Sequence, residues 1–254
     1  MSPIATSSIT LACIMGSLLF GMFLRTLLPK HHLTDDSKDV IKMGTGMIAT
    51  MTALVLGLVI SAAKGTYDML NSGIRNTAAK IVMLDRGMAE YGPETKEARD
   101  VLRRSVTTAI DRIWPAEKTA VSVGKVGKSG YALEELSAAL RQLSPRNDDQ
   151  RGLQSRALQI NMEIADAIFP IILQAGQSSV PMPFLVLLVC WLSIIFFSFG
   201  LFTSPNTTVI VVLLVCALSA ASALYLILEL DQPYGGFIKI SSDPLRNALA
   251  RLGQ

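Results

Sequence analysis

The stretch Met43-Gly-Thr-Gly-Met-Ile-Ala-Thr-Met-Thr-Ala-Leu-Val-Leu-Gly-Leu-Val-Ile-Ser-Ala-Ala63 decides the fold of this chain. It contains no charged side chain and is long enough to cross about 30 Å of hydrocarbon as a helix. A small residue recurs at every fourth position along it and just beyond it, at Thr45, Ala49, Ala53, Gly57, Ser61 and Gly65. Residues four apart lie on neighbouring turns of a helix, so this ladder predicts a groove down one side of the span.

Three further apolar runs without charges have a similar length. The four runs are Ile4–Leu24, Met43–Ala63, Phe184–Phe202 and Thr207–Leu228. Each has roughly 19–22 residues, which is what a membrane-spanning helix requires. The sequence therefore predicts an all-α membrane protein whose four spans come in two pairs. No basic residue precedes the first run, so we expect it to stay as an anchor rather than to be removed as a signal peptide.

The polar residues concentrate between the two pairs of spans. Residues 64–182 hold 16 of the 23 Lys and Arg and 14 of the 20 Asp and Glu, a nearly even balance that is typical of a folded region. We therefore expect a first span pair at 1–63, a helical region at 64–182, a second pair at 183–230 and a tail at 231–254. The net charge of +3 gives no reason to expect a nucleic-acid partner.

A series of mostly apolar residues, with Thr77 among them, continues beyond the second span in alternating steps of three and four. They are Ile60, Ala63, Tyr67, Leu70, Ile74, Thr77, Ile81, Leu84, Met88 and Tyr91. This seam predicts that the second span continues as one long helix that packs on partners outside the bilayer and ends at Gly92–Pro93. The same spacing from Leu153 to Ile171 predicts an antiparallel partner helix.

The groove on the second span has two possible uses. The first is close packing against another helix, which small residues at this spacing commonly serve in membranes. The second is the lining of a pore, in which hydroxyl groups offer polar contacts and apolar side chains form a constriction. The candidate pore-lining residues are Thr45, Ala49, Thr52, Ala53, Leu56, Gly57, Ile60 and Ser61.

Two clusters of ionisable residues flank the spans. The connector after the first span contains His31, His32 and three aspartates, which could hold a metal or sense pH, but capping of the next helix by Asp36 or Ser37 is the favoured interpretation. Glu229 and Asp231 follow the fourth span and are candidates for a pore mouth that attracts cations, although the favoured interpretation is that they pair with Lys or Arg of the long helices or lie in the headgroup zone. We predict no metal site.

Nothing in the sequence supports catalysis. It has no phosphate-binding glycine loop, no spaced zinc pattern and no nucleophile-elbow motif, and both histidines lie in one connector. We therefore expect neither an enzyme nor a bound cofactor.

Two parts of the sequence resemble the bacterial membrane proteins that carry a bestrophin-like domain. One comprises Asp36-Ser-Lys-Asp-Val-Ile-Lys42 and Ala53-Leu-Val-Leu-Gly-Leu-Val-Ile-Ser-Ala-Ala-Lys-Gly-Thr-Tyr-Asp68. The other comprises Glu229-Leu-Asp-Gln-Pro-Tyr-Gly-Gly-Phe237 and Ser241-Ser-Asp-Pro-Leu-Arg246. The resemblance implies a multi-pass protein of the bacterial inner membrane, with both termini and the helical region in the cytoplasm.

The resemblance also implies a homo-oligomer, a pentamer in bestrophins, whose second spans surround an ion path. In bestrophins, rings of bulky aromatic or aliphatic side chains from the second spans narrow the pore. The second span of this chain has no aromatic residue before Tyr67, so no ion selectivity is carried over from the resemblance. The leading hypothesis is an oligomeric ion channel in the lipid bilayer. The alternative is a non-conducting scaffold or sensor whose cytoplasmic helices recruit a soluble partner.

Overall fold

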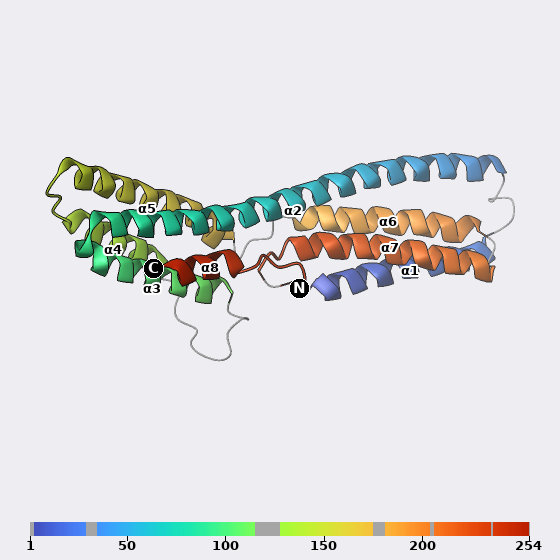
Figure 1. Cartoon of the computed structure of the whole chain (residues 1–254). Helices are drawn as coiled ribbons and strands as arrows, with labels where there is room; N and C mark the ends of the chain where they lie inside the picture. The colour runs from blue at the N-terminus through green and yellow to red at the C-terminus, as the bar shows by residue number, and fades with distance from the viewer. Residues whose placement is uncertain are drawn as a thin grey trace. The chain divides into compact units, whose positions relative to one another are not determined.

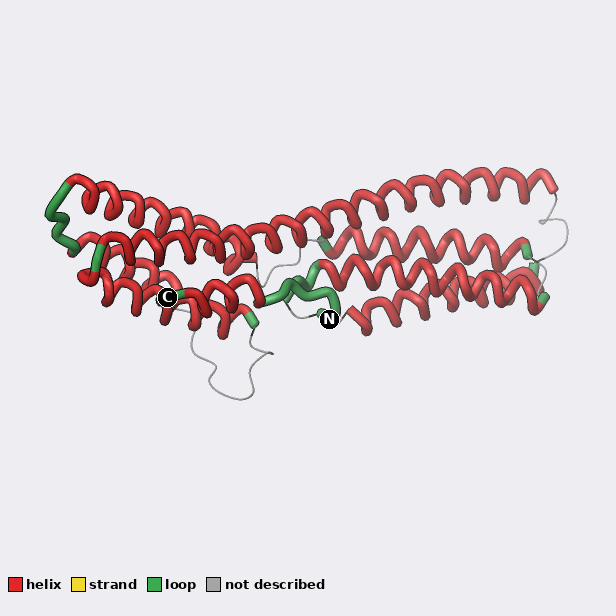
Figure 2. The backbone as a smooth tube through the Cα atoms, viewed as in Figure 1, coloured by secondary structure: helices red, strands yellow, loops and turns green. Residues whose placement is uncertain are grey.

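The computed structural model of the chain describes residues 3–28, 35–114, 128–174, 181–203, 206–234 and 236–253. All regular elements in these ranges are helical (Figures 1 and 2). In chain order they are α1 (Pro3–Leu27), α2 (Asp35–Tyr91), the short 3₁₀ helix η2 (Pro93–Thr95), α3 (Lys96–Ile113), α4 (Lys128–Gln142), α5 (Asp148–Gln174), α6 (Met182–Phe202), α7 (Thr207–Leu230) and α8 (Asp243–Arg251).

The four predicted spans are confirmed as helices that are long and apolar enough to cross a membrane. They are α1, the charge-free part of α2, α6 and α7. The predicted continuation of the second span is also confirmed, because α2 is a single helix of 57 residues. Thr203 follows α6 and Asn206 precedes α7, so the connection between these two helices is short.

The chain divides into two compact units. The first unit comprises Met1–Thr66 and Ser178–Gln232, and the second comprises Tyr67–Gln177 and Pro233–Gln254. The tail groups with the helical region, because its apolar residue Ile240 and its helix α8 belong to the core of the second unit.

The spans of the first unit pack around two apolar clusters. Helix α1 contacts both α6 and α7. One cluster joins α1, α6 and α7 through Ile14, Leu18, Ile195, Phe196 and Ala217. The other joins α2 to α6 and α7 through Val59, Ala63, Leu185, Leu188, Leu224 and Ile227. Large parts of all four helices stay exposed, as expected of surfaces that face lipid or other protein chains.

The predicted seam of α2 is buried from Leu70 to Tyr91. It forms the core of the second unit together with residues of α3, α4, α5 and α8, so its packing partners belong to this same chain. A single amphipathic helix buries its apolar face against the nearest complementary faces, and this chain itself supplies them.

Helix α5 is the antiparallel partner of α2, as predicted. Gln150 Nε2 donates to the Tyr91 carbonyl over 3.0 Å, and Lys80 Nζ lies 3.0 Å from Glu163 Oε2. The residue numbers rise along α2 while they fall along α5, which defines the antiparallel direction.

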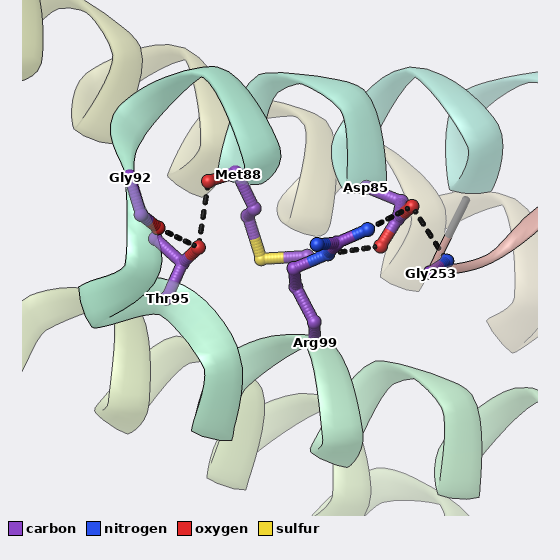
Figure 3. Close-up of polar contacts among 6 residues, drawn as sticks. All are labelled: Asp85, Met88, Gly92, Thr95, Arg99 and Gly253. Atoms are coloured by element: carbon purple, nitrogen blue, oxygen red, sulfur yellow. Dashed lines mark hydrogen bonds and ion pairs between the residues drawn. The ribbon is translucent and has the colours of Figure 1, made fainter.

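Helix α2 ends where the sequence predicts, at Gly92. This glycine has a φ of 134°, a conformation that disfavours side chains, and Pro93 follows it. Thr95 then caps the helix, because its hydroxyl donates to the Met88 carbonyl over 2.6 Å and to the Gly92 carbonyl over 2.8 Å (Figure 3). The Met88 carbonyl also accepts from the Gly92 backbone N–H over 3.4 Å, and the Gly92 carbonyl accepts from the Thr95 backbone N–H over 3.2 Å. The single hydroxyl proton of Thr95 therefore adds to the backbone hydrogen bonds that close the end of α2.

Candidate functional site

Five of the eight predicted pore residues lie toward the interior of their own unit. Thr45 donates from its hydroxyl to Ser198 Oγ over 3.2 Å, and the buried Thr52 donates to the Ile48 carbonyl over 2.7 Å. The other three pack beside the apolar clusters and are Ala49, Leu56 and Ile60. In this unit, therefore, the hydroxyl groups of both threonines are used for internal hydrogen bonds.

The remaining three predicted pore residues, Ala53, Gly57 and Ser61, are exposed. A Cβ built on Gly57 would meet no atom within 4 Å. Within the described residues of the first unit, therefore, no neighbouring helix approaches Gly57 closely.

The ladder of small residues does not stay on one side of α2. With 3.6 residues per turn, a step of four advances about 40° around the helix, so five steps turn through about 200°. Thr45 and Ala49 consequently face the other spans, while Gly57 and Ser61 face outward. The prediction of a continuous groove is corrected by this rotation.

The exposed side of α2 instead carries two adjacent stripes. The first, which we call the small stripe, consists of Gly46, Thr50, Ala53 and Gly57, all exposed. The second, which we call the bulky stripe, consists of Met47, Met51, Leu54 and Leu58, also exposed. Because each residue advances by about 100° and each bulky residue directly follows a small one, the centres of the two stripes lie about 100° apart, with Ser61 between them.

The two predicted mouth carboxylates at the end of α7 differ in exposure. Glu229 is buried and takes part in a hydrogen bond with the side chain of Tyr225, one helical turn earlier. Asp231 is half-buried and caps the helix end through its backbone N–H, which donates to the Ile227 carbonyl over 3.1 Å. In the single chain, therefore, the Glu229 side chain is enclosed within the first unit and is not presented at a surface.

A polar site of the second unit joins α2, α3 and the C-terminal residues (Figure 3). Arg99 Nε lies 2.7 Å from Asp85 Oδ1 and Arg99 Nη2 lies 2.9 Å from Asp85 Oδ2, which is a bidentate pair. The backbone N–H of Gly253 donates to the same Oδ2 over 3.2 Å. The hydrogen bond to Asp85 raises the pKa of the Arg99 guanidinium, so the cation persists throughout the physiological range.

The arrangement of this polar site indicates a structural role. Asp85 is buried, and its two oxygens are occupied by the three donors. No local pattern in the sequence indicates this pair, since Asp85 and Arg99 lie on different helices and no spacing rule connects them.

The two histidines of the connector, His31 and His32, lie outside the described residues. Among the residues that the structure does describe, no three His, Cys, Asp or Glu side chains group in a way that could hold a metal ion.

Comparison with known proteins agrees with this architecture. The Bestrophin-like domain family matches residues 11–245. A mutant of a bacterial bestrophin homologue from Klebsiella pneumoniae has a similar structure, with a TM-score of 0.66 and 13% sequence identity over 95% of this chain and 99% of that chain. A crystal structure described as a membrane protein gives a TM-score of 0.65 at 15% identity, covering 100% of this chain and 99% of that chain.

A third crystal structure, of the bestrophin homologue from Klebsiella pneumoniae phased on zinc, has a TM-score of 0.60 at 14% identity over 95% of this chain and 99% of that chain. No curated protein matches the sequence significantly. At these identities the structural likeness establishes the fold, while the family match covers most of the sequence. The chain therefore belongs to the bestrophin-like family of membrane proteins.

Proposed function

We propose that this protein is a homo-oligomeric ion channel of the bacterial inner membrane, in which the second span of every copy surrounds the ion path. The observation that carries the proposal is the uncovered side of α2, where the small stripe and the bulky stripe lie side by side. Small residues let helices approach closely in a membrane, and bulky residues fill the space that they leave.

The angle between the stripes suits a closed ring. In a ring with head-to-tail contacts, each helix touches two neighbours in directions that differ by about 90–110° for four or five copies. The bulky stripe of one copy can therefore pack on the small stripe of the next. The positions between the stripes then face the ring axis.

The proposed lining differs from the first set of candidates. Thr50, Leu54, Gly57 and Ser61 occupy the arc between the centres of the two stripes, and Leu54 is 75% exposed in the single chain. Gly57 and Ser61 belong to both sets. A ring of Leu54 side chains provides an apolar constriction of the kind that gates by excluding water.

Cysteine accessibility tests the lining directly. In full-length protein whose three native cysteines are replaced, Ser61→Cys reconstituted in a planar bilayer is expected to lose current when a charged thiosulfonate is added. Val211→Cys is the matched control, because Val211 is an exposed apolar residue of α7 that the ring leaves in lipid. Thr52→Cys is a second control, since the Thr52 side chain is buried within its own unit.

Three results would contradict the proposal. One is a monomeric particle in mild detergent. Another is an assembled particle that passes no current under gradients of common cations and anions, which would favour the non-conducting scaffold. The third is equal block of Ser61→Cys and Val211→Cys.

A further inference from the structure

A cavity of about 50 Å³ lies in the second unit, where α2, α3, α4, α5 and α8 meet. Most of its lining is aliphatic and includes Ile74, Ile81, Leu102, Ile164, Ile168 and Leu245. This volume has room for about three to five water-sized groups. A cavity with such a lining favours apolar atoms over water.

Three hydroxyl groups belong to residues in the wall of the cavity, and two of them are satisfied by their own helix. Ser105 Oγ donates to the Val101 carbonyl over 2.8 Å, and Thr108 Oγ1 donates to the Arg104 carbonyl over 2.9 Å. Thr77 differs, because its side chain is buried with 2% exposure and its hydroxyl has no hydrogen-bond partner in the described part of the chain. A buried hydroxyl without a partner is unfavourable, and a ligand with one polar atom removes that penalty.

The residues that line the cavity determine whether a charged or a neutral ligand fits it. Arg112 is the one ionisable residue among the residues that line the cavity, and it is half-buried. The aliphatic lining disfavours a charged ligand of either sign, because the ion would lose its hydration. A neutral molecule is therefore the class that fits.

We propose that this cavity is a binding site for a small neutral amphiphile, with a compact body of a few carbon atoms and one hydroxyl or carbonyl group that forms a hydrogen bond with Thr77. The occupant contacts side chains from five helices, so its binding stabilises the folded second unit. This site is separate from the proposed ion path, and its test does not depend on conduction.

Methyl NMR of the full-length protein in lipid nanodiscs provides the test. The probes are 2-methylpropan-2-ol and 2,2-dimethylpropane, which have the same shape and differ in one hydroxyl group. With isoleucine methyl groups labelled, both probes are expected to shift the signals of Ile74, Ile81 and Ile164 in a saturable way. The signal of Ile14, which is buried in the first unit, is expected to stay unchanged.

Substitutions separate the hydrogen bond from the apolar space. Thr77→Val keeps the shape of the side chain and is expected to weaken binding of the alcohol about five- to tenfold, the value of one neutral hydrogen bond, while binding of the hydrocarbon is unchanged. Ala109→Leu places a larger side chain in the wall and is expected to abolish binding of both probes. Ala79→Leu makes the same change at an exposed position of α2 and is expected to leave both affinities unchanged.

The proposal is overturned if the methyl shifts grow linearly without saturation, as they would if the probes only partitioned into lipid. It is also overturned if Thr77→Val changes the affinity for both probes equally or changes neither. Because Thr77→Val removes a hydroxyl without a partner and keeps the side-chain volume, this variant is expected to fold.

Discussion

Gly21 in α1 and Gly200 in α6 form a reciprocal backbone contact. A Cβ built on Gly21 would lie 2.4 Å from the Phe197 carbonyl oxygen, and a Cβ built on Gly200 would lie 2.2 Å from the Leu18 carbonyl oxygen. Each carbonyl belongs to the residue three positions before the opposite glycine. Only glycine permits this approach, which brings Cα–H groups and carbonyl oxygens of the two spans together.

Alanine at Gly21 or Gly200 is expected to destabilise the first unit by about 1–3 kcal/mol, because the added methyl group must push two helix backbones apart. Unfolding in mixed micelles titrated with dodecyl sulfate measures this change. Gly16→Ala is the matched control in the same helix, since a Cβ there meets no atom within 4 Å. Equal stability of Gly16→Ala and Gly21→Ala would disprove the contact.

Breaking the pair between Asp85 and Arg99 is expected to cost about 2–3 kcal/mol of unfolding free energy in the second unit. Asp85→Asn removes the charge that holds the buried end of Arg99 and weakens the hydrogen bond from Gly253. Glu135→Gln is the control, because Glu135 and Arg104 form an exposed pair at 3.7 Å, whose loss costs about 0–1 kcal/mol. Chemical denaturation of both variants measures the two losses of unfolding free energy. Similar losses would show that the Asp85–Arg99 pair contributes no more stability than an exposed ion pair.

Alkaline pH is expected to weaken the second unit through Tyr234. Burial raises the pKa of this phenol from 10.0 to about 12, and its hydroxyl has no hydrogen-bond partner in the described part of the chain. A raised pKa in the folded state means that the unfolded chain loses this proton first. The stabilising contribution is therefore complete below pH 10 and disappears as the pH rises toward 12, a loss of about 2–3 kcal/mol.

Tyr234→Phe isolates this contribution, since it keeps the edge-to-face ring contact with Trp114, whose centroid lies 6.0 Å away. Unfolding free energies of both proteins are measured between pH 8 and 12. We expect the variant to be at least as stable as the wild type at neutral pH, and the difference in its favour to grow above pH 10. Parallel pH profiles would show that Tyr234 ionises like an exposed tyrosine.

The tail is expected to detach more readily when Trp114 is replaced. The indole Nε1–H of Trp114 donates to the Ile240 carbonyl over 2.7 Å in a buried contact, so Trp114→Phe leaves that carbonyl without its donor. We expect trypsin to cleave the tail at Lys239 or Arg246 about tenfold faster, which mass spectrometry of the fragments measures. Trp191→Phe replaces the other tryptophan, in α6, and is expected to leave the cleavage rate unchanged.

Most of the fold followed from local patterns in the sequence. The four charge-free runs, the seam that ends at Tyr91 and the stop at Gly92 all appear in the structure, because helix length and helix ends depend on neighbouring residues. The family resemblance rested on two short stretches and is confirmed by a match over residues 11–245. The candidate lining of the pore stays a prediction.

The contacts between helices could be predicted from the sequence much less readily. Gly21 and Gly200 are separated by most of the chain, as are Asp85 and Gly253, and no periodicity pairs them. The ladder of small residues on α2 did not predict a continuous groove correctly, because steps of four residues rotate around a helix. The value of 3.6 residues per turn is enough to show this rotation.

By itself, the sequence determined which segments are helices and which of them can cross a membrane, because hydropathy and helix signals act over short distances along the chain. Only the tertiary structure decided which side of α2 is covered by its neighbours and which side carries the two exposed stripes. Burial depends on the placement of α1, α6 and α7 around that helix, and this placement is set by contacts between residues far apart in the sequence. The proposed pore lining therefore excludes Thr45 and Thr52 and consists of the arc of α2 that contains Thr50, Leu54 and Ser61.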